Sequence, residues 1–274
     1  MDTASALLPL AVAMLLTGVI GGLLAGLLGV GGGIVIVPVL DTALGMYGVD
    51  PAIRMHVAVA TSLAAIIPTS VSSTRAHRAR GALDESLARL WGPWIFIGAG
   101  LGTVLAAHLG GGALSAVFAV VALLVAIKMI LPLQDVLISR EIPRGPLAPV
   151  VPLAIGSLSS MMGIGGGTLS VPVLTLVNQP IHRAVGTAAL FGFLISLPGT
   201  VGYVVSGWGD PRLPPGSLGY VNLVGLVLIA PASVLAAPLG ARLAHRLDRR
   251  QLGLAFGVFL LLVAARMLYR SFMA

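Results

Sequence analysis

The sequence predicts an all-α integral membrane protein made of two homologous halves. The 274 residues are 57% hydrophobic and 9% charged, with a mean hydropathy of +1.04. A soluble domain of this composition would leave large apolar patches in water. The apolar runs are about 20 residues long and lack the alternation of barrel strands, which favours membrane-spanning helices. A glycine-rich segment also occurs twice, at 29–40 and 163–174.

The duplication extends over most of the chain. Gly29-Val-Gly-Gly-Gly-Ile-Val-Ile-Val-Pro-Val-Leu40 recurs as Gly163-Ile-Gly-Gly-Gly-Thr-Leu-Ser-Val-Pro-Val-Leu174, identical at eight of twelve positions with an offset of 134. The pattern His-x-Ala-Val-[Ala/Gly]-Thr occurs at 56–61 and again at 182–187, an offset of 126. A third set matches at an offset of 138: Gly102, Phe118, Lys128 and Met129 with Gly240, Phe256, Arg266 and Met267. Three ordered blocks indicate one fold used twice.

Each half contains five apolar elements. In the first repeat, residues 1–133, they are Ala6–Leu28, Ile34–Met46, Met55–Thr74, Leu90–Leu109 and Ala113–Leu131. Only Asp2 is charged before the first run, so a positive n-region is missing and this run is expected to belong to the mature fold rather than to a signal peptide.

A Pro-rich, charged segment, 134–149, separates the halves and is expected to be a cytoplasmic linker. The second repeat, 150–274, contains Val150–Met162, Thr168–Val177, Ala184–Val205, Leu218–Leu239 and Gln251–Tyr269. Both repeats are expected to form one integrated transport domain.

Arginine placement predicts that the repeats are inverted. Between the third and fourth elements, the first half has four arginines and the second half has only Arg212. Between the fourth and fifth elements the bias is reversed: residues 110–112 of the first half are uncharged, whereas the second half has four arginines there. The clusters are Arg75, Arg78, Arg80 and Arg89 in the first half, and Arg242, Arg246, Arg249 and Arg250 in the second. By the positive-inside rule, both clusters lie in the cytoplasm and both termini lie outside the cell membrane. The net charge of +7 then reflects topology rather than nucleic-acid binding.

The second element of each half is short. A helix of 10 to 14 residues covers roughly 15 to 21 Å, less than a hydrocarbon core of about 30 Å. We therefore expect the first two elements to form a re-entrant pair with the glycine cluster near its tip. Five full crossings per half is the alternative.

The glycine clusters are candidates for an anion site. The nine acidic residues lie in expected loops or at element ends, so a carboxylate cage for a cation is not expected. Exposed N–H groups at a helix start can hold an anion, and glycine lets it approach closely. Two prolines, Pro38 and Pro172, reinforce the helix breaks. The expected substrate-binding glycines are Gly31, Gly32, Gly33, Gly165, Gly166 and Gly167. The alternative is that these glycines only permit tight helix crossing.

Polar residues follow each break. Thr61, Ser62 and Thr187 are expected to donate to the substrate, although such hydroxyls often bond the preceding helical turn instead. His56 and His182 are candidates for a proton or anion contact, with interfacial capping of the backbone as the alternative.

Other chemistries are not expected. The chain has no cysteine and no histidine set with metal-ligand spacing, so neither a metal nor another cofactor is expected. It has no P-loop lysine, third Rossmann glycine, Gly-x-Ser-x-Gly or His-Glu-x-x-His. An intramembrane enzyme is thus the weaker alternative to a transporter.

The paired Gly-x-Gly-Gly-Gly-x-x-x-x-Pro-x-Leu motifs, the His-x-Ala-Val-x-Thr segments and the runs 217–222 and 237–245 resemble the TauE/SafE family of sulfite and sulfonate exporters. The resemblance covers nearly the whole chain. It implies a secondary transporter that moves a small sulfur-containing anion, sulfite or an organosulfonate, by alternating access and with possible proton coupling. An anion channel, or a permease for another small carboxylate or oxyanion, is the alternative. Small-residue steps at Gly18, Gly22 and Gly26 would also fit a homodimer in the bilayer.

Overall fold

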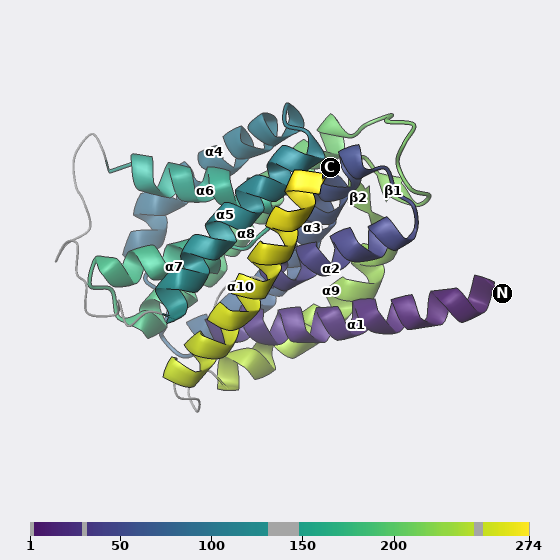
Figure 1. Cartoon of the computed structure of the whole chain (residues 1–274). Helices are drawn as coiled ribbons and strands as arrows, with labels where there is room; N and C mark the ends of the chain where they lie inside the picture. The colour runs from purple at the N-terminus through teal and green to yellow at the C-terminus, as the bar shows by residue number, and fades with distance from the viewer. Residues whose placement is uncertain (1–2, 29–31, 131–147, 244–248, 274) are drawn as a thin grey trace.

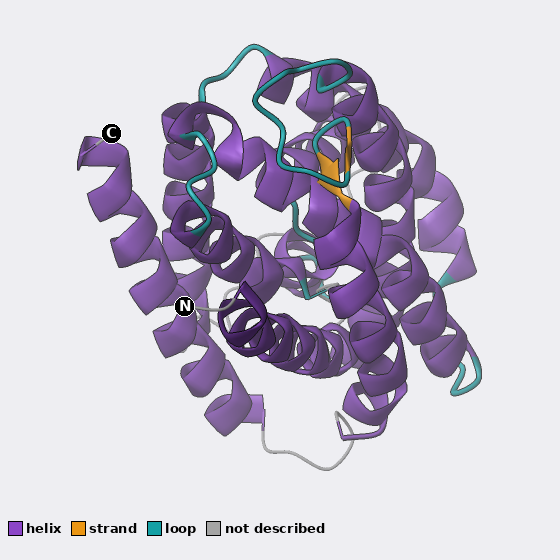
Figure 2. Cartoon of the chain, turned by 90° about the vertical axis from the view of Figure 1, so that its right-hand side faces the viewer, coloured by secondary structure: helices purple, strands orange, loops and turns teal. Residues whose placement is uncertain are grey.

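The chain folds into a bundle of helices in the computed structural model, which describes residues 3–28, 32–130, 148–243 and 249–273 (Figures 1 and 2). In the first half, the helices are α1 (Thr3–Leu28), α2 (Gly33–Met46), α3 (Pro51–Arg78), α4 (Glu85–Ala107) and α5 (Gly111–Ile130). In the second half, they are α6 (Val150–Met162), α7 (Gly167–Leu176), α8 (Ile181–Ser206), α9 (Leu223–Leu243) and α10 (Arg249–Met273). Each predicted element therefore corresponds to a helix, and most of the expected linker, 134–149, lies outside the described residues.

Five of the described helices are long and apolar enough to cross a membrane: α3, α4, α5, α8 and α9. Shorter apolar segments make up α2, α6, α7 and parts of α1 and α10. This pattern is that of a multi-pass membrane protein. The re-entrant pairing of the first two elements of each half stays a prediction.

The start of the ninth element was predicted wrongly. Residues from Leu218 were expected to be helical, but β1 (Ser217–Leu218) pairs antiparallel with β2 (Val221–Asn222), and α9 begins at Leu223. The turn between the strands contains Gly219 at φ +53°, a backbone conformation that favours glycine over other residues. Asn222 then caps α9, because its Oδ1 accepts the Gly225 N–H at 2.8 Å.

The central pair of helices is α3 and α8, which are related by the offset of 126. They pack antiparallel: a Cβ at Gly192 would lie 3.3 Å from Ser70 Cβ, and a Cβ at Gly199 would lie 2.9 Å from Leu63 Cδ1. Successive contacts therefore move forward on α8 and backward on α3. Of the five spanning candidates, α3 is the most buried, so the middle of this pair forms the core of the bundle.

The outer helices pack across the halves. We call two residues counterparts when they occupy matching positions in the two halves. The offset between counterparts is 134 for the first two helices of each half, 126 for the third helix, and 138 for the fourth and fifth helices. Helix α1 packs on α9, and α6 packs on α4. In both interfaces glycines lie against backbone carbonyls of the other helix. Gly22 of α1 contacts Ser233 of α9, and their counterparts Gly156 of α6 and Ile95 of α4 make the equivalent contact. In the same way, Gly240 of α9 contacts Leu23 of α1, and their counterparts Gly102 of α4 and Ser157 of α6 are in contact. Counterpart helices thus make the same contact with the halves exchanged.

The fifth helices of the two halves pack on each other. Figure 1 shows α5 and α10 side by side, and a Cβ at Gly257 of α10 would lie 3.3 Å from the Ala126 carbonyl oxygen of α5. All three interfaces therefore join one half to the other.

Candidate functional site

The two glycine breaks meet in the middle of the bundle. Gly33, the first residue of α2, lies against the Gly163 carbonyl, and a Cβ at Gly33 would be 2.9 Å from Ile164 Cα. Gly163 in turn packs on α3, since a Cβ there would lie 2.8 Å from Val59 Cα. Ser62 of α3 donates from Oγ to the Gly163 carbonyl at 2.7 Å. Elements from both halves therefore converge where α2 begins and α6 ends.

The described glycines of the motifs are needed for this packing. Gly32 has φ +74°, and a side chain there would overlap the Gly21 carbonyl of α1. A Cβ at Gly166 would lie 2.7 Å from Phe191 Cβ of α8. Gly165 and Gly167 are buried, and Gly31 lies outside the described residues. Tight packing, the alternative raised from the sequence, accounts for Gly32, Gly33 and Gly166, and substrate contact at these glycines stays a prediction.

Both short helices begin within the breaks and contain a proline. The first N–H groups of a helix have no acceptor inside that helix, and its dipole makes this end partially positive. Pro38 in α2 and Pro172 in α7 have no N–H, so the carbonyls of Ile34 and Thr168 lack their usual helical donor. Each break therefore combines the donor-rich start of a helix with a carbonyl that receives no bond from the residue four positions later.

Hydroxyl groups surround the second break. Ser159 in the last turn of α6, and Thr168 and Ser170 in the first turn of α7, are at most 2% exposed, and their oxygens have no hydrogen-bond partner. Their counterparts in the first half are Ala25, Ile34 and Ile36, which are also buried. The two breaks thus share glycines but differ in polarity.

Thr61 and Thr187 occupy equivalent places and join the halves. Thr61 Oγ1 in α3 accepts the Asn222 N–H at 2.9 Å, and Thr187 Oγ1 in α8 accepts the Asp84 N–H at 2.9 Å. Asp84 is the N-cap of α4, and the side chain of its counterpart Asn222 caps α9 in the same way. These threonines have a structural role, and substrate binding by them stays a prediction. The sequence motifs did not single out the two caps, although their offset of 138 marks them as counterparts.

His56 and His182 lie at opposite ends of the antiparallel α3 and α8, so they do not form one site. His56 is buried, and its Nε2 lies 3.1 Å from the Ala106 carbonyl, to which it must donate. Its ring centroid is 5.1 Å from that of Tyr220 and 6.4 Å from that of Tyr203. We call His56, Tyr203 and Tyr220 the aromatic plug. His182 is exposed.

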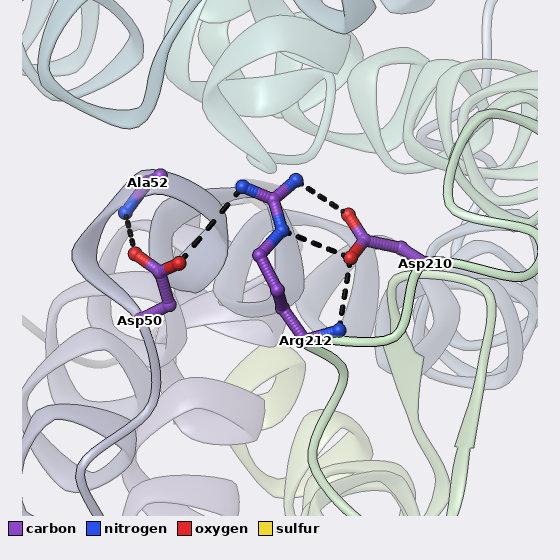
Figure 3. A network of polar contacts seen from close by, with 4 residues as sticks. All are labelled: Asp50, Ala52, Asp210 and Arg212. Atoms are coloured by element: carbon purple, nitrogen blue, oxygen red, sulfur yellow. Dashed lines mark hydrogen bonds and ion pairs between the residues drawn. The ribbon is translucent and has the colours of Figure 1, made fainter.

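An ion-pair network lies at the same end as the aromatic plug. Figure 3 shows Arg212 between two carboxylates, with its guanidinium 2.7 Å from Asp210 and 3.9 Å from Asp50, the N-cap of α3. The hydrogen bonds from Arg212 lower the pKa of Asp210 to about 2. Burial and the nearby Asp210 carboxylate raise the pKa of Tyr220. We call this end, which includes 47–50 and 207–222, the Arg212 end. The network links the two halves there.

The opposite end of α3 borders two open hollows. One, of about 550 Å³, lies between α3 and α9 and is lined by Ser72, Arg75 and Val234 among others. The other, of about 360 Å³, lies where α3, α4 and α8 meet, beside Thr74 and Arg78. We call this the Arg75 end.

The buried acidic group of α2 is already paired. Asp41 is 4% exposed, and its carboxylate accepts from Arg54 Nε at 2.9 Å. Within the part of the chain that the structure describes, no three His, Cys, Asp or Glu residues are grouped as a metal site would require.

Comparison with known proteins agrees with this architecture. The chain is 34% identical over 255 residues to a probable membrane transporter protein of Haemophilus influenzae, covering 92% of this chain and 96% of the relative. It is 25% identical over 283 residues to the probable membrane transporter protein YunE of Bacillus subtilis, covering 95% and 98%. No solved structure matches the chain. The model of the family described as sulfite exporter TauE/SafE matches residues 14–267. The chain therefore belongs to the TauE/SafE family of membrane transporters.

Proposed function

We propose that this protein is a secondary transporter that moves a small sulfur-containing oxyanion, sulfite or an organosulfonate, through a site between the two glycine breaks. The observation that carries the proposal is the contact, inside the bundle, of the start of α2 at Gly33 with the break of the other half at Gly163, which ends α6 four residues before α7 begins. Helix starts favour anions, and broken membrane helices are the common site of substrate binding in transporters built from repeats.

We propose further that the halves form an inverted repeat and expose the site alternately to the two sides. Two observations support this. The counterpart helices α3 and α8 pack antiparallel, and the α1–α9 contacts match the α6–α4 contacts with the halves exchanged. The Arg212 end is closed by the aromatic plug and the ion-pair network, whereas the Arg75 end carries hollows. With the arginine clusters inside, the Arg75 end faces the cytoplasm, and both termini lie outside it.

A flux assay tests the proposed cargo. Purified protein in liposomes is expected to accumulate radiolabelled sulfite or methanesulfonate when a proton gradient or membrane potential is imposed, and accumulation is expected to saturate. Transport of Na⁺ or amines without any response to sulfite or sulfonates would refute the proposal. Sulfonate flux that follows its own gradient but never accumulates would instead indicate a channel.

Cysteine labelling tests the topology, because the chain has no native cysteine. A cysteine at Tyr47 or Trp208, both exposed at the Arg212 end, is expected to react with an impermeant maleimide in intact cells. A cysteine at Arg80 or Arg183, both exposed at the other end, is expected to react only after permeabilisation. The reverse pattern would contradict the proposed orientation.

A further inference from the structure

Two hydroxyls at the start of α7 differ from most serine and threonine hydroxyls in this bundle. Such a hydroxyl usually donates to the carbonyl four residues earlier in its helix, as Thr69 and Thr103 do at 2.7 and 2.8 Å. Thr168 and Ser170 make no hydrogen bond although they are 2% and 0% exposed. A buried hydroxyl without a partner is destabilising, and a bound acceptor would remove that penalty.

Of these two hydroxyls, that of Thr168 lies nearer the first N–H groups of α7. The Cα–Cβ bonds of a helix tilt toward its N-terminus, so the side chain of Thr168, the second residue of α7, extends toward the start of the helix. Ser170 is two residues further on, so its side chain leaves α7 on nearly the opposite side, and its N–H already donates to the Gly166 carbonyl at 2.9 Å. The first N–H groups of a helix have no acceptor inside that helix. The Thr168 hydroxyl and these backbone donors together suit an anionic head with several oxygens.

The first break lacks these donors. At the positions of Thr168 and Ser170, α2 has Ile34 and Ile36, which are 0% and 1% exposed. Because Gly33 touches Gly163 and Ile164, the apolar start of α2 lies directly against the second break. One side of the shared centre is therefore rich in donors and the other is apolar.

A positive charge also reaches α7 but has no described equivalent on α2. Lys128 of α5 donates from Nζ to the Pro172 carbonyl at 2.5 Å and is partly buried. Its counterpart on α10, Arg266, is exposed. The electrostatic asymmetry has the same direction as the asymmetry of the hydroxyls.

We infer that the anionic head of the substrate binds at the start of α7, where the hydroxyl of Thr168 donates to it, and that its apolar part lies against Ile34, the counterpart of Thr168. This inference rests on the proposed transport function and deepens it. It makes Thr168 a specificity-determining residue. It also predicts that the site prefers a monoanion with an apolar group, of the type R–SO₃⁻, over sulfate.

Matched variants of α7 test the role of the Thr168 hydroxyl. Thr168→Val is expected to weaken methanesulfonate binding about tenfold, the effect of one hydrogen bond to a charged group. Thr175→Val is the control, because this hydroxyl lies at the other end of α7 and is already bonded to Pro172 at 2.8 Å. The affinity of Thr175→Val for methanesulfonate is expected to equal that of the wild type. The melting temperature of Thr168→Val is expected to stay the same or rise, since an unpaired hydroxyl is removed, whereas a structural hydroxyl would lower it.

A second variant tests the apolar side. Ile34→Thr gives the first break the residue that the second break has, with little change in shape. It is expected to reduce the ratio of sulfate to methanesulfonate dissociation constants by improving the binding of sulfate. Binding is measured on purified protein by isothermal titration with each anion.

The outcomes separate this inference from the proposed function. If the wild type binds and accumulates sulfonates but Thr168→Val binds them normally, the inference is wrong and the proposed function stands. The inference is also wrong if the wild type prefers sulfate. If the wild type neither binds nor transports any of these anions, the proposed function fails, and the inference fails with it.

Discussion

The Arg212 end and the Arg75 end are built from counterpart helices but are filled differently. The three residues of the aromatic plug have counterparts at the other end, by offsets of 126, 126 and 138: His56 with His182, Tyr203 with His77, and Tyr220 with Ala82. At the Arg212 end the three rings pack together, with the two tyrosine centroids 6.5 Å apart. At the Arg75 end His182 is exposed, His77 bonds the Gly26 carbonyl at 3.2 Å, and Ala82 has no ring.

The duplicated backbone therefore determines where the helices can come together at each end of the bundle, whereas the side chains determine whether that end is closed. Both ends are bordered by a threonine that accepts an N–H from the other half, so the backbone link is shared. At the Arg75 end Ala82 has no ring to match Tyr220. The described ion pairs at that end, both made by Glu85, lie within one half, whereas Arg212 bridges the two halves. Hollows are also found at the Arg75 end. We expect Tyr220 and Arg212 to stabilise the state in which the Arg212 end is closed.

The largest expected effect is on the stability of the centre of the bundle, where the glycine breaks lie between the two ends. Gly32→Ala should lower the free energy of unfolding by about 3 kcal/mol or more, because it combines a positive φ with overlap of the Gly21 carbonyl. Gly48→Ala is the matched control: φ is +71° there, but a Cβ would meet nothing within 4 Å. It should cost only about 1 kcal/mol. Thermal unfolding in detergent measures both, and equal melting temperatures would contradict the packing role of Gly32.

The next effect removes the ring that distinguishes the ends. Tyr220→Ala makes position 220 resemble Ala82 and should destabilise the closed Arg212 end by about 2 kcal/mol, since an aromatic side chain is lost from a partly buried cluster. Spin labels on cysteines at Tyr47 and Trp208 should then give longer and broader distances by double electron–electron resonance. Tyr269→Ala, at a tyrosine that is 62% exposed, is the control. An unchanged distance distribution in Tyr220→Ala would mean that the plug does not hold this end closed.

A smaller effect is expected from the ion pairs. Arg212→Gln removes the bridge between Asp50 and Asp210, but all three groups are near solvent, and exposed pairs contribute little. The same spin-label pair should show a modest shift toward longer distances. Raising the salt concentration in the wild type should act in the same direction, because screening weakens exposed charges. A shift as large as that of Tyr220→Ala would show that charge rather than packing closes the end.

The smallest effect is that of pH on this network. Arg212 holds the pKa of Asp210 at about 2, below the usual value for an aspartate. A carboxyl whose pKa is depressed in the folded state stabilises it above the unfolded pKa, and this contribution is lost as pH falls through the folded pKa. The pair should thus be intact from pH 8 to pH 5 and be lost only between about pH 4 and pH 2. The Tyr47–Trp208 distances should be constant over the first range, and a change between pH 8 and pH 5 would implicate another group.

The sequence predicted most of the architecture because the duplication and the long apolar runs are local patterns. It placed the ten helices that the structure describes and both breaks, and among its candidate site residues are Gly33 and Ser62, which the structure brings together at the Gly163 carbonyl. It missed the strand pair before α9, because 217–222 is apolar enough to read as helix and only Gly219 and Asn222 mark the turn and the cap.

The side-chain roles could not be read from spacing alone. Thr61 and Thr187 bond backbone N–H groups 161 and 103 residues away in the chain, and such partners are fixed only by the packing of the halves. The aromatic plug likewise joins α3, α8 and a loop. The unpaired hydroxyls of Thr168 and Ser170 become distinctive only once the structure shows that they skip the usual bond to the preceding turn.

The most direct test of the account measures both ends in one experiment. Spin labels are placed at Tyr47 and Trp208 for the Arg212 end, and at Arg80 and Arg183 for the Arg75 end, in protein reconstituted with and without methanesulfonate. Alternating access predicts opposite changes: whenever the distances at one end lengthen, those at the other shorten. Simultaneous lengthening at both ends would indicate a continuous channel, and distances that ignore the anion at both ends would contradict a transport site between the glycine breaks.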